Sequence, residues 1–538
     1  MNDSCHDQAK KKSDCFETSY FQKKSSKKKL FLNGLFIFGF LNLLWFLFRT
    51  GTKPSRIIYP CQKAALKNMS LAFSTLVPLI SFSAFRLKTR KILARSKKPI
   101  VAILILAPPL GGIYLQATTS VEEIGLNIIG TDTSSPTNSD IFVVNGRDIA
   151  HIQNLIDLMG SEGLNFYQSS ISAVNQGPSG LLSSSDVILL KVNAQWSMRG
   201  GTNTDMLKEL IQAIVDHPDG FTGEIIVADN GQGRGALARL KPNAEDQKQS
   251  IQDVVDNFSE NYDVSTFLWD TIRQTEVLEY SNGDMNNGYI VYDTADVDTG
   301  IYLSYPKFET DFGTKVSFKN GIWNGTHYEE ILKVINLPVL KSHGGYGVTA
   351  TIKNYMGVPT QALTNAHQRI ATGGLATLMV ECGLPTLNII DAKWVNANPA
   401  NSLSAGPATS YREATRVNVL IAGVDPVALD YWSSKNILMK TSEQIGYTDI
   451  HTLDPDNTLK SGLTEAFGVW LEKSKGELIQ SGYNVTSNEQ EMNIYVNAST
   501  ISSQSINYDY LWLIYGFVGT NAAAFIVIII RNFRKSKS

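Results

Sequence analysis

The chain has 538 residues, more than one ordinary domain, and is long enough to bury a large core. Its four cysteines (Cys5, Cys15, Cys61 and Cys382) form no C-x-x-C pair, so the sequence signals neither a zinc site nor an iron–sulfur cluster. The net charge of −2 hides an asymmetry, because residues 99–530 hold 24 basic and 46 acidic side chains, a net charge of −22. So acidic a body repels phosphate backbones, which argues against nucleic acid as a partner.

The N-terminal part alternates basic and apolar stretches. Residues 1–29 are lysine-rich and predict a disordered, basic cytoplasmic tail. Residues 30–48 carry no charge and are long enough to cross a bilayer, 69–85 form a marginal span, and 99–117 form a third apolar run. Together, residues 30–117 are predicted to be an N-terminal membrane region.

The C-terminal end has the composition of a final membrane span. Residues 510–530 carry no charge, and the tail 531–538 that follows is basic. Under the positive-inside rule, the basic flanks predict cytoplasmic termini and an extracytoplasmic domain over residues 118–509. The sequence therefore predicts a multi-pass protein of the cell membrane, with membrane lipid as a partner.

Apolar runs alternate with helical patterns through residues 118–509, which predicts an α/β fold. We expect a doubly wound, mostly parallel sheet with Rossmann-like layers, because continuous apolar runs separated by helices are typical of strands buried on both faces. An insertion rich in Tyr, Asp, Asn and Gly is expected over residues 257–330. The predicted strands are Ile141–Val144, Val187–Leu190, Ile225–Ala228, Val334–Leu340, Leu387–Ile390 and Val417–Ala422.

Polar side chains follow several of these strands where each run ends. Lys191 and Lys341 end two runs, and Asn193 and His343 lie two residues beyond them. Parallel strands emerge at one edge of a sheet, where open α/β sheets bind ligands, so we expect these side chains to meet in one cleft. The predicted ligand-binding residues are Lys191, Asn193, Lys341, Lys353, Asn354 and Asp391. His343 is the acid–base candidate, because histidine titrates near neutral pH.

Structural interpretations of the same residues stay open. A strand-terminal lysine is usually solvated, and Asp391 could bind a turn. A metal held by His343 with Asp229 or Asp391 is chemically reasonable, although no fixed spacing supports it. The glycine-rich loop Gly231–Gly235 follows a strand, but it lacks the G-x-G-x-x-G spacing of a dinucleotide-binding loop.

Several separated motifs occur in the order seen in one known family. The stretch Ile335–Gly357 has a strand, Lys-x-His, Gly-Val-Thr and Lys-Asn-x-Met-Gly, and similar matches occur at Leu189–Asn193, Thr202–Ile211, Leu387–Ala392 and Val419–Asp430. Over roughly residues 140–440 the chain resembles the family of domain of unknown function 362. Gly51–Cys61 also resembles a stretch that precedes this domain in membrane-attached members. Some members carry ferredoxin-like cysteine clusters, which this sequence lacks, so an iron–sulfur cofactor is not expected.

The resemblance brings no established activity, so the residues carry the functional prediction. We expect a membrane-anchored extracytoplasmic protein that binds a small anionic ligand at the carboxyl edge of its sheet. Whether it also transforms that ligand is left open. The alternatives are a non-enzymatic surface or assembly protein and a redox-associated protein.

Overall fold

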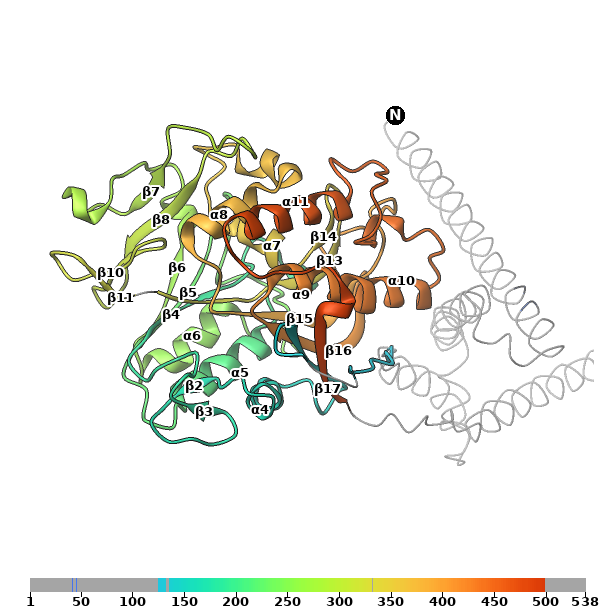
Figure 1. The fold of residues 1–538 in the computed structure, drawn as a ribbon, viewed down its shortest axis with the longest axis horizontal. Coiled ribbons are helices and arrows are strands. Elements are labelled where there is room, and N and C mark those ends of the chain that lie inside the picture. The colour runs from blue at the N-terminus through green and yellow to red at the C-terminus, as the bar shows by residue number, and fades with distance from the viewer. Residues whose placement is uncertain (1–40, 42–44, 46–123, 132–134, 331, 499–538) are drawn as a thin grey trace, which may run out of the picture. The chain divides into compact units, whose positions relative to one another are not determined.

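The computed structural model describes Leu41, Trp45 and residues 124–131, 135–330 and 332–498. The chain divides into two compact units, Met1–Glu122 and Glu123–Ser538. The second unit contains a large sheet with helices on both of its faces (Figure 1).

The main sheet joins ten strands. Its eight-strand path runs β17 (Met492–Ala498), β1 (Ser139–Asn145), β16 (Thr415–Gly423), β15 (Leu387–Asn396), β12 (Lys333–Asn336), β4 (Val187–Lys191), β5 (Glu224–Asp229) and β6 (Val264–Leu268). A hairpin of β13 (Val339–His343) and β14 (Gly347–Thr349) joins the path where β13 pairs with β15.

All six predicted runs form strands of this sheet, which is mixed but mainly parallel. Strand β16 is antiparallel to both of its neighbours, and the other strands along the path run in one direction. The run Val334–Leu340 forms two strands rather than one, with Pro338 between them. Proline has no backbone N–H to give to a sheet, so the ladder breaks there and β13 turns into the hairpin.

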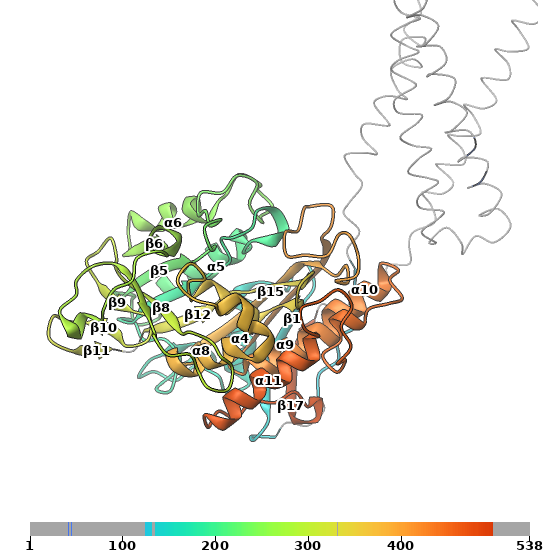
Figure 2. The same cartoon turned by 90° about the horizontal axis from the view of Figure 1, so that it is seen from above.

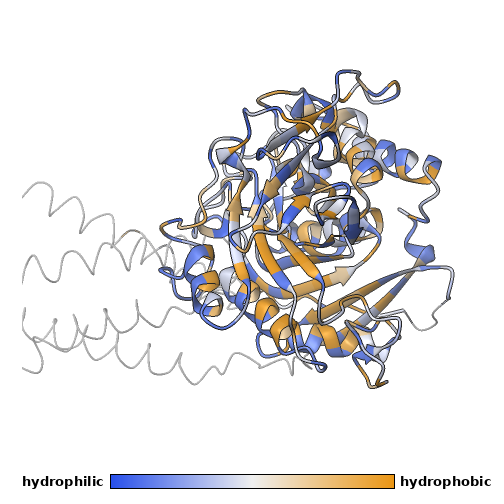
Figure 3. Ribbon diagram, turned by 90° about the vertical axis from the view of Figure 1, so that its left-hand side faces the viewer, coloured by the Kyte–Doolittle hydropathy of each residue, from blue (hydrophilic) through white to orange (hydrophobic). Residues whose placement is uncertain are grey.

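Successive side chains along each strand point to opposite faces of the sheet and pack into two separate hydrophobic cores. In β1, Phe142 and Val144 pack into one core with helices α4, α5 and α6, while Ile141 and Val143 pack into the other with α7, α8, α9 and α11. Figure 3 shows the apolar strands between helices whose outer faces are polar. The helices are α4 (Ile152–Ser161), α5 (Thr204–Val215), α6 (Ile251–Ser259), α7 (Thr351–Asn354), α8 (Gly374–Cys382), α9 (Pro426–Ser433), α10 (Lys440–Gln444) and α11 (Phe467–Gln480).

A second, antiparallel sheet lies beside β6, as the two views in Figures 1 and 2 agree. Its aromatic residues fix it there, since Phe308 packs on Phe267 and Trp269. Strand β6 itself belongs to the main sheet, so the start of the expected insertion 257–330 is part of the core. The strands are β7 (Gly288–Val291), β8 (Ser304–Glu309), β9 (Lys315–Ser317), β10 (Gly321–Trp323) and β11 (Tyr328–Glu330), and β2 (Tyr167–Gln168) pairs separately with β3 (Gln176–Gly177).

The order of the strands creates a topological switch point between β4 and β12. From β4 the chain adds β5 and then β6 on one side, and from β12 it adds β15 and then β16 on the other. The connections that leave the carboxyl ends of β4 and β12 therefore diverge. This is where doubly wound sheets leave a crevice for a ligand.

The expected transmembrane helices are not supported. Across the residues that the structure describes, no helix is both long and apolar enough to cross a membrane. The proposed spans at 30–48, 69–85, 99–117 and 510–530 lie outside the described residues. We therefore correct two predictions. One is the presence of transmembrane helices at both ends of the fold, and the other is the multi-pass membrane localisation that was inferred from them. Both predictions were based only on the uncharged, apolar runs of the sequence.

Candidate functional site

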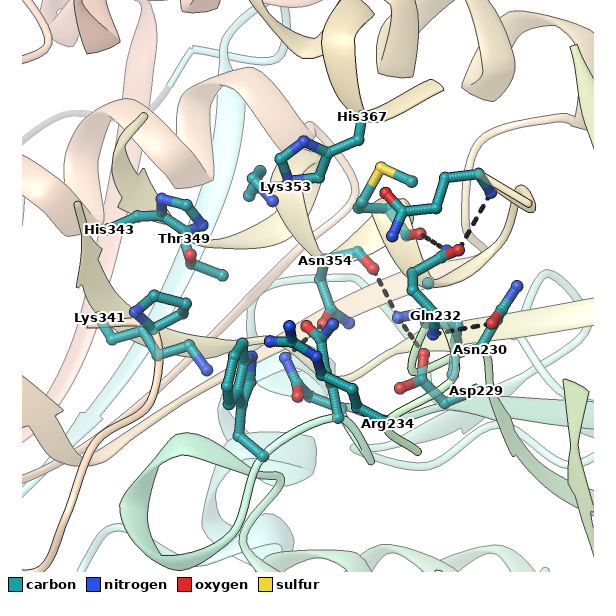
Figure 4. Close-up of a pocket in the computed structure, with 18 residues that line it drawn as sticks. Asp229, Asn230, Gln232, Arg234, Lys341, His343, Thr349, Lys353, Asn354 and His367 are labelled. Carbon is teal, nitrogen blue, oxygen red and sulfur yellow. Dashed lines mark hydrogen bonds and ion pairs between the residues drawn. The ribbon is translucent and has the colours of Figure 1, made fainter. Parts of the chain in front are cut away.

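A cavity of about 390 Å³ opens at the carboxyl ends of β4 and β5, beside the switch point. The hairpin β13–β14 and helix α7 provide its opposite wall, and the labelled side chains in Figure 4 surround one common space. Six of the seven predicted site residues line it, namely Lys191, Asn193, Lys341, His343, Lys353 and Asn354, together with the metal candidate Asp229. Residues about 160 positions apart therefore meet as the parallel strands predict.

A buried ion pair forms the floor of the cavity. Lys191 Nζ lies 2.8 Å from Asp229 Oδ1, and both side chains are at most 2% exposed. Lys191 also donates to the carbonyls of Val192 and Asn354, while the backbone N–H of Ala194 donates to Asp229 Oδ2. Burial lowers the pKa of Lys191 and raises that of Asp229, and the attraction between the two charges opposes both changes. These contacts tie β4, β5 and α7 together.

A chain of asparagines crosses the sheet beneath the cavity. Asn193 Nδ2 donates to Asn354 Oδ1 at 3.5 Å, and Asn354 Nδ2 donates to Asn336 Oδ1 at 2.8 Å. Asn336 in turn donates to Asn388 Oδ1 at 2.9 Å. The chain fixes the orientation of Asn354 and leaves the buried Oδ1 of Asn193 without a hydrogen-bond partner among the described residues.

Two further lysines face the cavity without a carboxylate of their own. Lys341 donates to the carbonyl of Gly200, and burial together with the charge of Lys353 lowers its pKa to about 7. Burial, helped by the charge of Lys191, lowers the pKa of Lys353 to about 8. The Nζ atom of Lys353 lies 5.4 Å from the centre of the Tyr346 ring. Both amines therefore lie in surroundings that destabilise their positively charged forms.

The tautomer of His343 is fixed by the glycine-rich turn. The backbone N–H of Gly345 donates to His343 Nδ1 at 3.0 Å, so the neutral ring carries its proton on Nε2. Burial, followed by the charges of Lys353 and Lys341, holds the pKa of His343 well below its usual range. The neutral ring offers an Nε2–H donor at this position, and the acid–base role that the sequence suggests stays a prediction.

Asp391 is the predicted site residue that the structure does not bring to the cavity. Strand β15 continues to Asn396, so Asp391 lies within the strand and is fully buried. Its carboxylate accepts from Asn243 Nδ2 at 3.2 Å and from the backbone N–H of Lys393 at 3.0 Å. Burial raises its pKa to about 6. Asp391 acts on the site only at a distance, by favouring the charged form of Lys341.

No metal-binding cluster is assembled in the described part of the chain. There, no group of three His, Cys, Asp or Glu side chains could hold a metal ion. Asp229 is already engaged by Lys191, and Asp391 lies away from the cavity wall. His343 and Asp229 line the same cavity but belong to no such group of three among the described residues, and Asp391 does not line it.

The loop Gly231–Gly235 wraps around a carboxylate of the protein itself. The backbone N–H groups of Gly231, Gly233 and Gly235 all donate to Asp270, which leaves them unavailable to a phosphate. The loop instead presents the side chains of Gln232 and Arg234 to the cavity. Gln232 is held by the carbonyls of Met356 and Pro359, each 2.8 Å away.

Several cavity residues lie outside the strand-end motifs, so the sequence-based prediction missed them. His367 lines the cavity, and burial lowers its pKa to about 4. Thr349 occupies the hairpin strand β14, and its buried hydroxyl has no hydrogen-bond partner among the described residues. For Gln232 and Arg234, the one sequence feature that pointed to the cavity was their position just after β5. The other lining residues that were missed are Gln195, Trp196, Asn230, Met356, Gly357, Gln361 and Pro407.

Comparison with curated proteins and with solved structures found no match. Residues 188–435 match the model of the family described as Domain of unknown function (DUF362). This range begins in β4 and contains every residue that lines the cavity. Residues 188–435 therefore form a DUF362 domain.

Proposed function

We propose that the protein binds a small anionic molecule in the switch-point cavity. The observation that carries this proposal is the imbalance of charge around it. The side chains of Lys341, Lys353 and Arg234 line one cavity, and Asp229, the one acidic residue among the described lining residues, is already paired with Lys191. Amines buried without a counter-charge are costly, so an anion that enters the cavity removes that cost.

Polar groups around the cavity suit the orientation of such a ligand. Thr349 Oγ1 is a buried hydroxyl without a hydrogen-bond partner among the described residues, so it is available as a donor. The Nε2–H of His343 supplies a neutral donor. A carboxylate or phosphate oxygen accepts from lysine, imidazole and hydroxyl donors alike, so the same set of residues fits either group.

Thermal stability measured with added anions tests the proposal. Phosphate, sulfate and lactate are added to the purified full-length chain, and glycerol serves as the uncharged control. A ligand at 100 times its dissociation constant stabilises a protein by about 2.7 kcal/mol, which raises the melting temperature by several degrees. We expect at least one anion to do this and glycerol to do nothing.

Lys341→Met removes one of the proposed charges and keeps the apolar stem. We expect it to abolish the stabilisation by anions without unfolding the empty protein, because it also removes a buried charge. Lys248→Met is the matched control, since Lys248 is exposed and lies outside the cavity. If no anion stabilises the wild type, or if both variants lose the effect equally, the proposal is wrong and a structural role for the cluster is favoured.

A further inference from the structure

Three lysines reach the cavity, and they differ in what their amines contact. Lys191 is bonded to a carboxylate and two carbonyls, and Lys341 is bonded to the carbonyl of Gly200. Lys353 is only 7% exposed, yet its amine has no hydrogen bond or ion pair with any residue that the structure describes. The amine lies over the face of the Tyr346 ring. Lys353 is therefore a buried amine that keeps all of its bonding capacity for whatever fills the cavity.

The surroundings of Lys353 favour the uncharged amine. Lys191 and Lys341 repel its charge, and so do His343 and His367 whenever they are protonated. Burial is the larger cause, the charge of Lys191 adds to it and no carboxylate offsets them, so the pKa of Lys353 falls to about 8. A desolvated lysine beside other cationic groups is the setting in which proteins use lysine as a nucleophile.

We propose that Lys353 forms a covalent imine with a ligand that carries a carbonyl next to its anionic group, as in a 2-oxo acid. This inference rests on the proposed binding of an anion. The lysine nitrogen attacks the carbonyl carbon, and a proton moves from nitrogen to oxygen to give a carbinolamine. The hydroxyl then takes the remaining proton of the nitrogen and leaves as water while the carbon–nitrogen double bond forms, so that no oxidant or reductant is needed. The charges of Lys341 and Arg234 hold the anionic group during this step.

Two groups beside Lys353 assist the loss of water. The Nε2–H of His343 belongs to a ring whose other nitrogen is held by Gly345, so it donates to an oxygen in the cavity. Thr349 Oγ1 has no partner among the described residues and lines the same cavity. Hydrogen bonds from such neutral groups stabilise the oxygen of the carbinolamine as negative charge develops on it.

Reductive trapping tests the imine directly. The full-length protein is incubated separately with glyoxylate, pyruvate and 2-oxoglutarate in the presence of borohydride, then digested and analysed by mass spectrometry. We expect the Lys353 peptide to gain the mass of one of these acids less one oxygen atom. Lactate has the charge of pyruvate without the carbonyl, so it should compete with trapping but leave no adduct. Sulfate should also compete.

Lys353→Arg keeps a cation and removes the nucleophilic amine. We expect this variant to lose the adduct, and we expect the exposed control Lys248→Arg to retain it. If Lys353→Arg fails to fold, the mapping of the wild-type adduct still decides the question. The inference is overturned if none of the acids labels Lys353, or if exposed lysines are labelled as strongly. Should anions nevertheless stabilise the wild type, the proposed function stands and only the imine falls, whereas failure of both measurements rejects both.

Discussion

At the scale of single residues, the ion pair beneath the cavity determines what its neighbours can be. Gly357 lies directly against it, and a Cβ atom added there would overlap both Asp229 Oδ1 and Lys191 Nζ. The carbonyl of Gly357 also accepts from the backbone N–H of Asn230. The glycine is needed for close approach, which brings the turn after α7 against the ends of β4 and β5.

Gly357→Ala should therefore damage the site and the fold together. The new methyl group has to displace a buried charge pair, and overpacking or breaking such a pair costs about 3 kcal/mol. The free energy of unfolding, measured with urea, should fall by about this amount, and stabilisation by anions should weaken.

Gly476→Ala supplies the control for this substitution. Gly476 lies in helix α11, where an added Cβ would meet nothing within 4 Å. Alanine should stabilise that helix by about 0.5–1 kcal/mol. Equal stability of the two variants would show that the Lys191–Asp229 pair tolerates a shift and that Gly357 has no special role.

At the scale of elements, the short helix α7 is held from a distant part of the chain. Asp430 of α9 accepts from the backbone N–H groups of Thr351 and Ile352, at 2.6 and 3.2 Å, and from the Thr351 hydroxyl. A helix of one turn has little stability of its own. Asp430 thus positions α7, and with it Lys353 and Asn354, at the cavity.

Asp430→Asn should loosen the site through this anchor. The amide oxygen of asparagine still accepts, but its NH₂ group cannot accept from the backbone, so one buried donor loses its partner. We expect a loss of about 1–3 kcal/mol in the free energy of unfolding and weaker stabilisation by anions.

Asp425→Asn is the control that separates a loss of stability from a loss of anion binding. Asp425 is a comparably buried carboxylate that caps α9, where it accepts from the N–H groups of Val427 and Ala428, and it does not line the cavity. We expect this variant to lose stability while the response to anions persists. If Asp430→Asn unfolds no more easily than wild type and binds anions as well, α7 is held by other contacts.

How far the sequence predicts this site follows from how each residue is placed. Lys191 and Lys341 follow continuous apolar runs, and the shared direction of β4 and β13 brings them to one edge of the sheet. Asp391 was misplaced because β15 continues beyond its apolar run. The direction of β16 depends on which strand it pairs with, and His367 reaches the cavity from the 3₁₀ helix Ala366–Thr372. Long-range pairing and the path of the chain between the strands leave no local pattern in a sequence.

At the scale of the whole molecule, the site is a cluster of positive charge in an acidic body. Residues 99–530 carry a net charge of −22, yet the cavity gathers Lys341, Lys353 and Arg234. An acidic surface repels anions at long range, so the affinity for an anion has to come from short-range contacts inside the cavity. Those contacts depend on the lysines being protonated, which makes binding sensitive to pH.

The stability of the empty protein should rise with pH through the window in which these lysines titrate. The pKa values of Lys341 and Lys353 fall from 10.5 to about 7 and about 8 in the folded chain. Above neutral pH the unfolded chain therefore binds more protons than the folded one, so the free energy of unfolding increases with pH. Each lysine contributes a slope of at most about 1.4 kcal/mol per pH unit.

A bound anion should counteract this slope. Sulfate is the suitable probe, because its own charge does not change in this range. It favours the protonated lysines, so its stabilising effect should be largest near neutral pH and should decline towards about pH 9.5. Urea unfolding with sulfate or with chloride at equal ionic strength measures the difference. In Lys341→Met the sulfate effect should be absent across the whole window, since this variant no longer holds the anion. A sulfate effect of constant size across the window would mean that sulfate acts as a general stabilising salt, and that the buried lysines do not hold it.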